Sequence, residues 1–213
     1  MAAKKEKEIR LEDILWNCCN YLRGKVEKAD NRNAVLGLVF LKFAGDKFEE
    51  RKDQIVAEHG EIEAFINKPA FYLSENVFYL EEECRWSFIC ENASKTTIAS
   101  ILDKAMAKIE EDNEYLHGAL PQRFYSNLRV ESRVIKSLID EINKISKERF
   151  DENDLIGRVY EYFLRVFAKD EGKAGEFYTP KSIVELIAEL IEPYSGRIYD
   201  PCCGSRWNVC TIT

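Results

Sequence analysis

The sequence lacks several features that mark whole classes of protein. None of its 213 residues belongs to an apolar run of about 18 residues, so no membrane span is expected. The N-terminal segment M-A-A-K-K-E-K-E-I-R is charged and has no apolar stretch of the kind found in secretory signals. Only two histidines occur, His59 and His117, and each precedes a glycine, which favours surface turns over metal ligands or bases. We therefore expect a cytoplasmic protein without a metal site.

The cysteines form neither a disulfide framework nor a metal-binding motif. No C-x-x-C spacing occurs, and adjacent pairs do not suit a disulfide scaffold. Reduced thiols in a cytosol are the expected state. Cys18 and Cys19 lie in an apolar periodic stretch and are expected to pack in a core. The seven cysteines are Cys18, Cys19, Cys84, Cys90, Cys202, Cys203 and Cys210.

The negative net charge of the chain does not indicate a general affinity for nucleic acid, but it does not exclude a local basic patch. The chain is 46% hydrophobic and 32% charged, as folded globular proteins are, and its net charge is −7. Residues 120–150 nevertheless hold seven basic residues against four acids. Contact with a DNA backbone and a solvated helix face with i,i+4 ion pairs both explain this excess. The basic residues are Arg123, Arg129, Arg133, Lys136, Lys144, Lys147 and Arg149.

Apolar residues recur at helical spacing along most of the chain. Residues 34–44 are apolar nearly all round, which indicates a central buried helix, and Trp16 is also expected in the core. Residues 69–80 are aromatic and irregular, which favours a loop with a short strand. Ser94, Thr96 or Thr97 is the expected cap of one helix. Helices are predicted over residues 11–24, 31–58, 96–112, 131–147 and 151–168.

The pattern changes toward the end of the sequence. Thr179 and Pro180 fit the N-cap and first position of a further helix, which ends before Pro193. Residues 197–200 fit the start of a strand. The predicted architecture is an all-helical block of about 150–170 residues followed by the entrance to an α/β domain.

The segment D-P-C-C-G-S, residues 200–205, has two explanations when it is taken alone. It fits a ligand loop beyond the carboxyl end of a strand, where glycine permits close approach. It also fits a solvent-facing turn built on Asp-Pro, and spacing alone favours the turn. The segment G-E-F-Y-T-P, residues 175–180, changes this balance because a helix cap does not explain why both motifs occur about twenty residues apart.

Together the two motifs resemble the N6-adenine DNA methyltransferases that are the modification subunits of type I restriction-modification systems. The family pattern is G-E-F-Y-T-P, a helix, an E-P-x-x-G turn and then a loop of the form V-Y-D-P-A/C-C-G-S-G-G. The chain has all four in order, the last two as E-P-Y-S-G and R-I-Y-D-P-C-C-G-S. Upstream segments such as R-W-S-F-I-C-E-N and D-L-I-G-R-V-Y-E-Y-F-L resemble the N-terminal helical domain of the same subunit. The resemblance extends to Ser205.

The resemblance implies a mainly α fold, in which a helical bundle precedes the start of a Rossmann-like methyltransferase domain. It implies a helical domain over residues 1–150, the start of the methyltransferase domain over 151–205 and a tail over 206–213 outside the family pattern. The implied cofactor is S-adenosylmethionine. The implied partners are a specificity subunit that reads the sequence, a second modification subunit, a restriction subunit and double-stranded DNA.

The resemblance also implies which residues hold the cofactor. The G-E-F-Y-T-P segment is expected to close over S-adenosylmethionine near its methionine portion. The D-P-C-C-G-S segment is expected to form the first cofactor loop, where Gly204 lets backbone N–H groups approach the carboxylate. These expected residues are Glu176, Tyr178, Thr179, Pro180, Asp200, Pro201, Cys203, Gly204 and Ser205.

The sequence departs from the family pattern after Ser205. Arg206 and Trp207 stand where the family has two glycines, and no N-P-P-F/Y segment for the flipped adenine occurs. A frameshift or premature stop is the hypothesis that this departure suggests, and no catalytic residue is assigned. The expectation is a truncated form that cannot catalyse the reaction; the alternative is a non-catalytic helical module that binds the specificity subunit or DNA.

Overall fold

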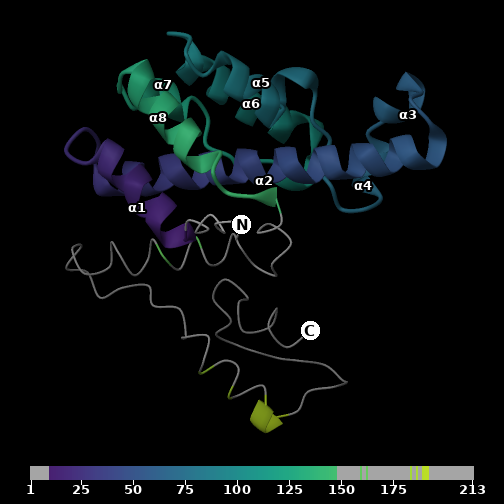
Figure 1. Ribbon diagram of the computed structural model, residues 1–213, viewed down its shortest axis with the longest axis horizontal. Coiled ribbons are helices and arrows are strands. Elements are labelled where there is room, and N and C mark those ends of the chain that lie inside the picture. The colour runs from purple at the N-terminus through teal and green to yellow at the C-terminus, as the bar shows by residue number, and fades with distance from the viewer. Residues whose placement is uncertain are drawn as a thin grey trace, which may run out of the picture. The chain divides into compact units, whose positions relative to one another are not determined.

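The computed structural model describes residues 10–147, with isolated helical positions further along the chain. It divides the chain into two units, Met1–Phe163 and Leu164–Thr213. In the first unit the regular elements of the described part are all helices, and no strand occurs among them (Figure 1). This confirms the predicted helical block. The isolated positions are Val159, Tyr162, Ile183, Leu186, Glu189, Leu190 and Ile191.

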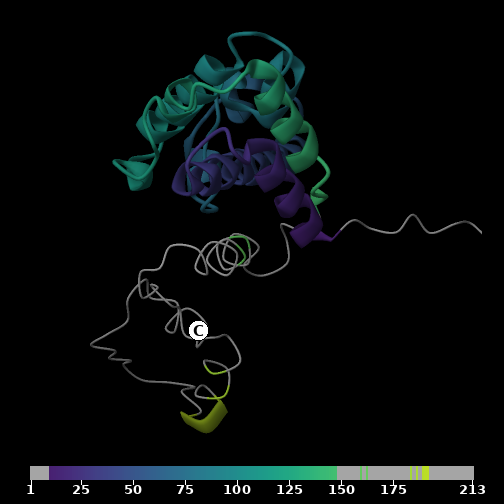
Figure 2. The same ribbon diagram turned by 90° about the vertical axis from the view of Figure 1, so that its left-hand side faces the viewer.

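Three helices, two from the start and one from the end of the described part, pack together as a core. Helix α1 spans Leu11–Leu22, α2 spans Lys28–His59 and α8 spans Ser132–Ile142. Figure 2 shows α1 beside α8, although more than a hundred residues separate them in sequence. Their apolar stripes meet because each helix carries aliphatic residues three and four positions apart. Ile14 and Ile142 are both fully buried.

Helix α2 is the longest element and organises the rest (Figure 1). Its 32 residues extend over roughly 48 Å at the usual rise per residue. The first half packs against α1, α5 and α8, and Leu38 and Leu41 are fully buried there. This confirms the central buried helix predicted over residues 34–44.

A second group of helices covers another side of α2. The 3₁₀ turn η1 spans Glu82–Cys84, α5 spans Trp86–Asn92 and α6 spans Ile98–Asp112. Thr97 is the N-cap of α6, as one of the three predicted candidates, but its side chain makes no capping hydrogen bond. Helix α5 approaches α2 closely, because a Cβ on Gly45 would lie 2.7 Å from the Cβ of Trp86.

Short helical turns complete the described part. Helices α3 and α4 follow the C-terminal end of α2, and a turn η2 and helix α7 connect α6 to α8. Their bounds are Glu63–Ile66 for α3, Ala70–Leu73 for α4, Glu114–Leu116 for η2 and Phe124–Asn127 for α7.

Two expectations within the described part are wrong. Trp16 is 45% exposed rather than in the core, because it faces away from the stripe of Ile14 and Cys18 and lies under the Arg23 guanidinium, 5.1 Å from its ring centroid. The short strand expected in residues 69–80 is also absent: α4 begins this segment, and irregular backbone follows it. The aromatic side chains of this segment pack against the helices and do not form part of a strand. Tyr72, for example, stacks on Phe48 of α2 with ring centroids 4.6 Å apart.

The helices predicted beyond residue 147 can be compared with the structure only at single described positions. Val159 and Tyr162 are helical and buried, as the helix predicted over residues 151–168 requires at those places. In the second unit, Ile183, Leu186 and Leu190 are helical, in agreement with the helix predicted after Pro180. The strand predicted over residues 197–200 lies outside the described residues.

Candidate functional site

The residues predicted to hold S-adenosylmethionine lie outside the described part of the chain, so their placement stays a prediction. The structure neither brings them together nor separates them. They are Glu176, Tyr178, Thr179, Pro180, Asp200, Pro201, Cys203, Gly204 and Ser205. The candidate sites that the structure does describe all belong to the helical block.

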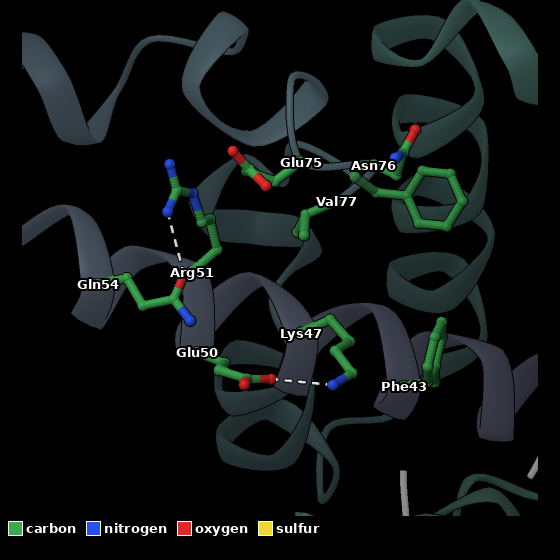
Figure 3. A pocket seen from close by; sticks show the side chains of 9 residues that line it. Phe43, Lys47, Glu50, Arg51, Gln54, Glu75, Asn76 and Val77 are labelled. Atoms are coloured by element: carbon green, nitrogen blue, oxygen red, sulfur yellow. Dashed lines mark hydrogen bonds and ion pairs between the residues drawn. The ribbon is translucent and has the colours of Figure 1, made fainter. Parts of the chain in front are cut away.

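A hollow beside the middle of α2 is the first candidate (Figure 3). It encloses about 390 Å³ between α2 and the loop that follows α4. Asn76 lies at the turn of this loop with φ of 57°, a left-handed conformation that asparagine tolerates well. Phe43, Val77 and Phe78 give the hollow an apolar lining. The rest of the lining is polar and comes from α2 and the loop: Lys47, Glu50, Arg51, Gln54, Glu75 and Asn76.

The two cations of the hollow are held by neighbouring groups. Figure 3 shows the ammonium of Lys47 near Glu50, at 3.0 Å, and the guanidinium of Arg51 near the amide oxygen of Gln54, also at 3.0 Å. Arg51 also donates to the backbone carbonyl of Phe71 at 3.1 Å. None of the nine lining residues is a cysteine, histidine, serine or threonine. The hollow is therefore suited to packing or weak docking rather than to nucleophilic chemistry.

A polar pair inside the bundle was not expected from the sequence. Lys42 and Asp46 lie one turn apart on α2, and the ammonium donates to the carboxylate where both side chains are more than nine-tenths buried. Burial of either charge alone would be costly, so each stabilises the other. The K-x-x-x-D spacing at the edge of the apolar run is the sequence signal that could have identified this pair.

Further polar contacts join helices that are distant in sequence. The Trp86 indole donates to the side-chain oxygen of Asn143 at 2.9 Å, which links α5 to the end of α8. The Asn17 amide donates to buried Glu141 at 2.8 Å, which links α1 to α8. Both contacts satisfy polar groups within the bundle and hold its helices in register.

The thiols of the helical block are protonated at neutral pH. Burial raises the pKa of Cys19 and that of Cys90 to about 11, and it raises the pKa of Cys84 to about 12. Burial raises the pKa of Cys18 as well, and the Glu141 carboxylate adds to this effect. Cys18 and Cys19 are buried, which confirms that they pack in the core. A thiol nucleophile at these positions would need a low pKa, which the surroundings oppose.

The described residues contain neither a metal-ligand cluster nor a membrane helix. No group of three or more histidine, cysteine, aspartate or glutamate side chains gathers there as a metal site would require. Within the same residues, no helix is both long enough and apolar enough to cross a bilayer.

The basic residues of the 120–150 segment divide into two kinds. On α8, Arg133 pairs with Glu131 at 2.6 Å and Lys136 pairs with Asp140 at 2.5 Å. Lys144 pairs with Glu141 at 2.6 Å. Arg123 and Arg129, which flank α7, and Lys147 are exposed and have no such partner within residues 10–147. The predicted helix face with ion pairs is therefore confirmed for α8, and it does not account for the unpaired cations.

Comparisons with known proteins bear on the whole chain. The family described as the HsdM N-terminal domain matches residues 11–163, and the family described as N-6 DNA Methylase matches residues 151–207. The type I restriction enzyme MjaIX methylase subunit of Methanocaldococcus jannaschii is 35% identical over 209 residues, which cover 91% of this chain and 37% of that protein. The HindI methylase subunit of Haemophilus influenzae is 45% identical over 118 residues, or 51% of this chain and 26% of that protein.

A more distant relative gives the same picture. The type I restriction enzyme MpnII methylase subunit of Mycoplasma pneumoniae is 25% identical over 240 residues, which cover 95% of this chain and 44% of that protein. The chain therefore spans less than half the length of each of these relatives.

Proposed function

The chain belongs to the family of type I restriction-modification methylase subunits, and from this premise we propose that it supplies the helical assembly domain and the first cofactor-binding elements of such a subunit. The two overlapping family matches carry the proposal, since together they cover residues 11–207 in the order that the family requires. The division into a helical domain over 1–150 and a methyltransferase segment over 151–205 is part of this proposal.

The proposed reaction is transfer of a methyl group from S-adenosylmethionine to N6 of adenine in DNA. The cofactor supplies the methyl group. The proposed role of Asp200 and Gly204 is to form the loop that binds it, with Glu176 and Tyr178 closing over it. An adenine must leave the base stack before its amino group can be reached, so the reaction also needs a pocket for the flipped base. No catalytic residue of this chain is proposed.

The proposed partners are those of a type I complex in the cytoplasm. A specificity subunit would select the DNA sequence, and a second modification subunit and a restriction subunit would complete the assembly. The match of residues 11–163 to the HsdM N-terminal domain supports a place for the helical block in such an assembly. The second candidate is a helical module that binds the specificity subunit or DNA without catalysing methyl transfer.

Two measurements test these proposals. The 213-residue chain, co-expressed with a tagged specificity subunit, should be retained with that subunit on an affinity column. If both proteins are folded and all of the chain appears in the flow-through, a role in such a complex is contradicted. Isothermal titration calorimetry with S-adenosylmethionine then separates the candidates. Saturable binding that Asp200→Ala weakens supports the cofactor loop, whereas no heat of binding in a chain that retains the specificity subunit supports the non-catalytic module.

A further inference from the structure

We propose that Arg123, Arg129 and the α7 turn between them form a contact surface for the phosphate backbone of duplex DNA. We call residues 122–130 the arginine turn. The proposal rests on the proposed function in one respect, since a DNA-modifying complex must hold its substrate. The surface itself is identified from ion pairing, backbone conformation and anchoring in the structure.

The first observation is that these two arginines are available to a ligand. Both are exposed, and neither guanidinium has a hydrogen bond or ion pair within residues 10–147. Their basic neighbours Arg133, Lys136 and Lys144 each bind an acid of α8 or its cap. Within residues 120–147, the cations without an ion pair or hydrogen bond are Arg123, Arg129 and Lys147, and the two arginines are the ones that flank α7.

The second observation is the backbone conformation of the same two residues. Arg123 has φ of 52° and Arg129 has φ of 53°, both in the left-handed region that favours glycine. Residues other than glycine adopt this region at an energetic cost, and they stay there only when the surrounding structure fixes them. A glycine would fit either position with less strain but would remove the guanidinium.

The third observation is the anchoring of the turn. The backbone N–H groups of Tyr125 and Ser126 donate to the two carboxylate oxygens of buried Asp103, at 2.8 and 2.9 Å. The Tyr125 hydroxyl donates to the carbonyl of Ala34 on α2 at 2.9 Å, and its ring is buried. Side chains from α6 and backbone from α2 thus fix the turn, so a ligand meets arginines whose backbone is already ordered.

The chemistry of the surface favours a phosphate backbone over a protein partner. A guanidinium donates in a planar fork that matches two phosphate oxygens. Exposed Ser126 and Asn127 lie between the arginines, and hydroxyl and amide side chains also contact phosphates in protein–DNA interfaces. Protein interfaces are instead centred on exposed aromatic or aliphatic anchors. Within the turn, Phe124, Tyr125 and Leu128 are at least partly buried, so it offers no exposed anchor of that kind.

The test uses the variant Arg123→Gly with Arg129→Gly in the full 213-residue chain. Binding of a fluorescently labelled duplex is followed by anisotropy across a salt series. Each lost phosphate contact should reduce the slope of log affinity against log salt by about 0.9, and so weaken binding roughly eightfold at 0.1 M salt. The melting temperature should stay unchanged or rise, because glycine relieves the left-handed strain. Reduced affinity without reduced stability is the expected result.

A matched control removes the same number of charges from α8. The variant Arg133→Gln with Lys136→Gln loses two cations that are already paired, so its salt slope should change by much less than that of the glycine variant. Equal losses in the two variants would overturn the proposal, since net charge alone would then explain binding. Failure of the wild-type chain to bind duplex at low salt would overturn it as well.

Three outcomes separate this surface from the proposed function. If the glycine variant binds DNA normally but no longer co-purifies with the specificity subunit, the arginine turn is a protein interface and the DNA assignment is wrong. If it binds DNA normally and co-purifies normally, the turn has neither role, while membership in the complex stands. If the wild-type chain binds duplex through these arginines but never retains the specificity subunit, the proposed function fails and the surface stands.

Discussion

The two halves of α2 perform different tasks in one continuous helix. Up to Phe48 the helix lies among other helices, and Leu38, Leu41 and Phe48 are fully buried. Beyond that point Ile55 is the fully buried residue, and the charged remainder is covered in part by α3 and α4. We call these parts the core half and the rim half. Both parts belong to the same α-helix, so helix type does not separate a residue with a structural role from one with a surface role. The burial and ion pairing of each side chain do.

The largest expected effect is in the core half, at the buried ion pair. Lys42→Met leaves the Asp46 carboxylate buried without its partner, and the free energy of unfolding should fall by about 3–5 kcal/mol in urea denaturation. Adding Asp46→Leu should restore most of the loss, because an apolar pair then replaces the ionic one. If the single variant is as stable as wild type, the pair is not buried as described.

A smaller effect is expected at the closest contact between α2 and α5. In Gly45→Ala the new Cβ would lie 2.7 Å from the Cβ of Trp86 and 3.2 Å from its backbone nitrogen, so α5 must shift. Overpacking of this kind should lower the free energy of unfolding by about 1–3 kcal/mol in chemical denaturation. The control Asp53→Ala, at an exposed position of the rim half, should change it by less than about 0.5 kcal/mol. Equal values for the two variants would remove the distinction between the halves.

A pH-dependent effect should appear at Cys19, whose backbone carbonyl accepts a hydrogen bond of 3.1 Å from Asn31 at the start of α2. Burial raises the pKa of this thiol from 9.0 to about 11 in the folded chain. The folded state therefore favours the protonated form. Its contribution to stability is present below pH 9 and is lost as the pH rises toward about 11.

Denaturation of the wild type and of Cys19→Ala across pH 8 to about 11 would measure this contribution. The loss of stability with rising pH should be shallower in the variant. Parallel profiles for the two proteins would show that the thiol is not shielded from solvent in the folded state.

The smallest effect is expected at the rim. Leu73 at the end of α4 is 40% exposed, so Leu73→Ser should change the free energy of unfolding by less than about 0.5 kcal/mol. Thermal unfolding followed by circular dichroism checks this prediction. A loss above about 2 kcal/mol, which is typical of a buried leucine, would mean that Leu73 belongs to the core.

Periodicity predicted most of the helical block because each helix buries one stripe. The stripe of α8, from Val134 to Ile142, is buried as the sequence indicates. The expectation that Trp16 lies in the core is wrong because its position is out of phase with the stripe of α1. Hydrophobicity alone does not determine a side chain's direction; its phase on the helix does.

Contacts between residues that are distant in sequence account for the points on which the sequence allowed more than one explanation. The excess charge of residues 120–150 had two explanations, and only the structure shows which arginines have acids within reach. The left-handed conformations of Arg123 and Arg129 could not be predicted either, since arginine has no preference for that region. The cofactor residues came from motif order and spacing, and their geometry remains a prediction.

The central claim, that this chain is an assembling part of a type I modification subunit, is tested most directly by sedimentation velocity with a purified specificity subunit. The account predicts that the 213-residue chain moves into a faster boundary together with the specificity subunit and saturates at a fixed ratio. Two boundaries that keep their separate sedimentation coefficients at all ratios, with both proteins folded, would contradict it.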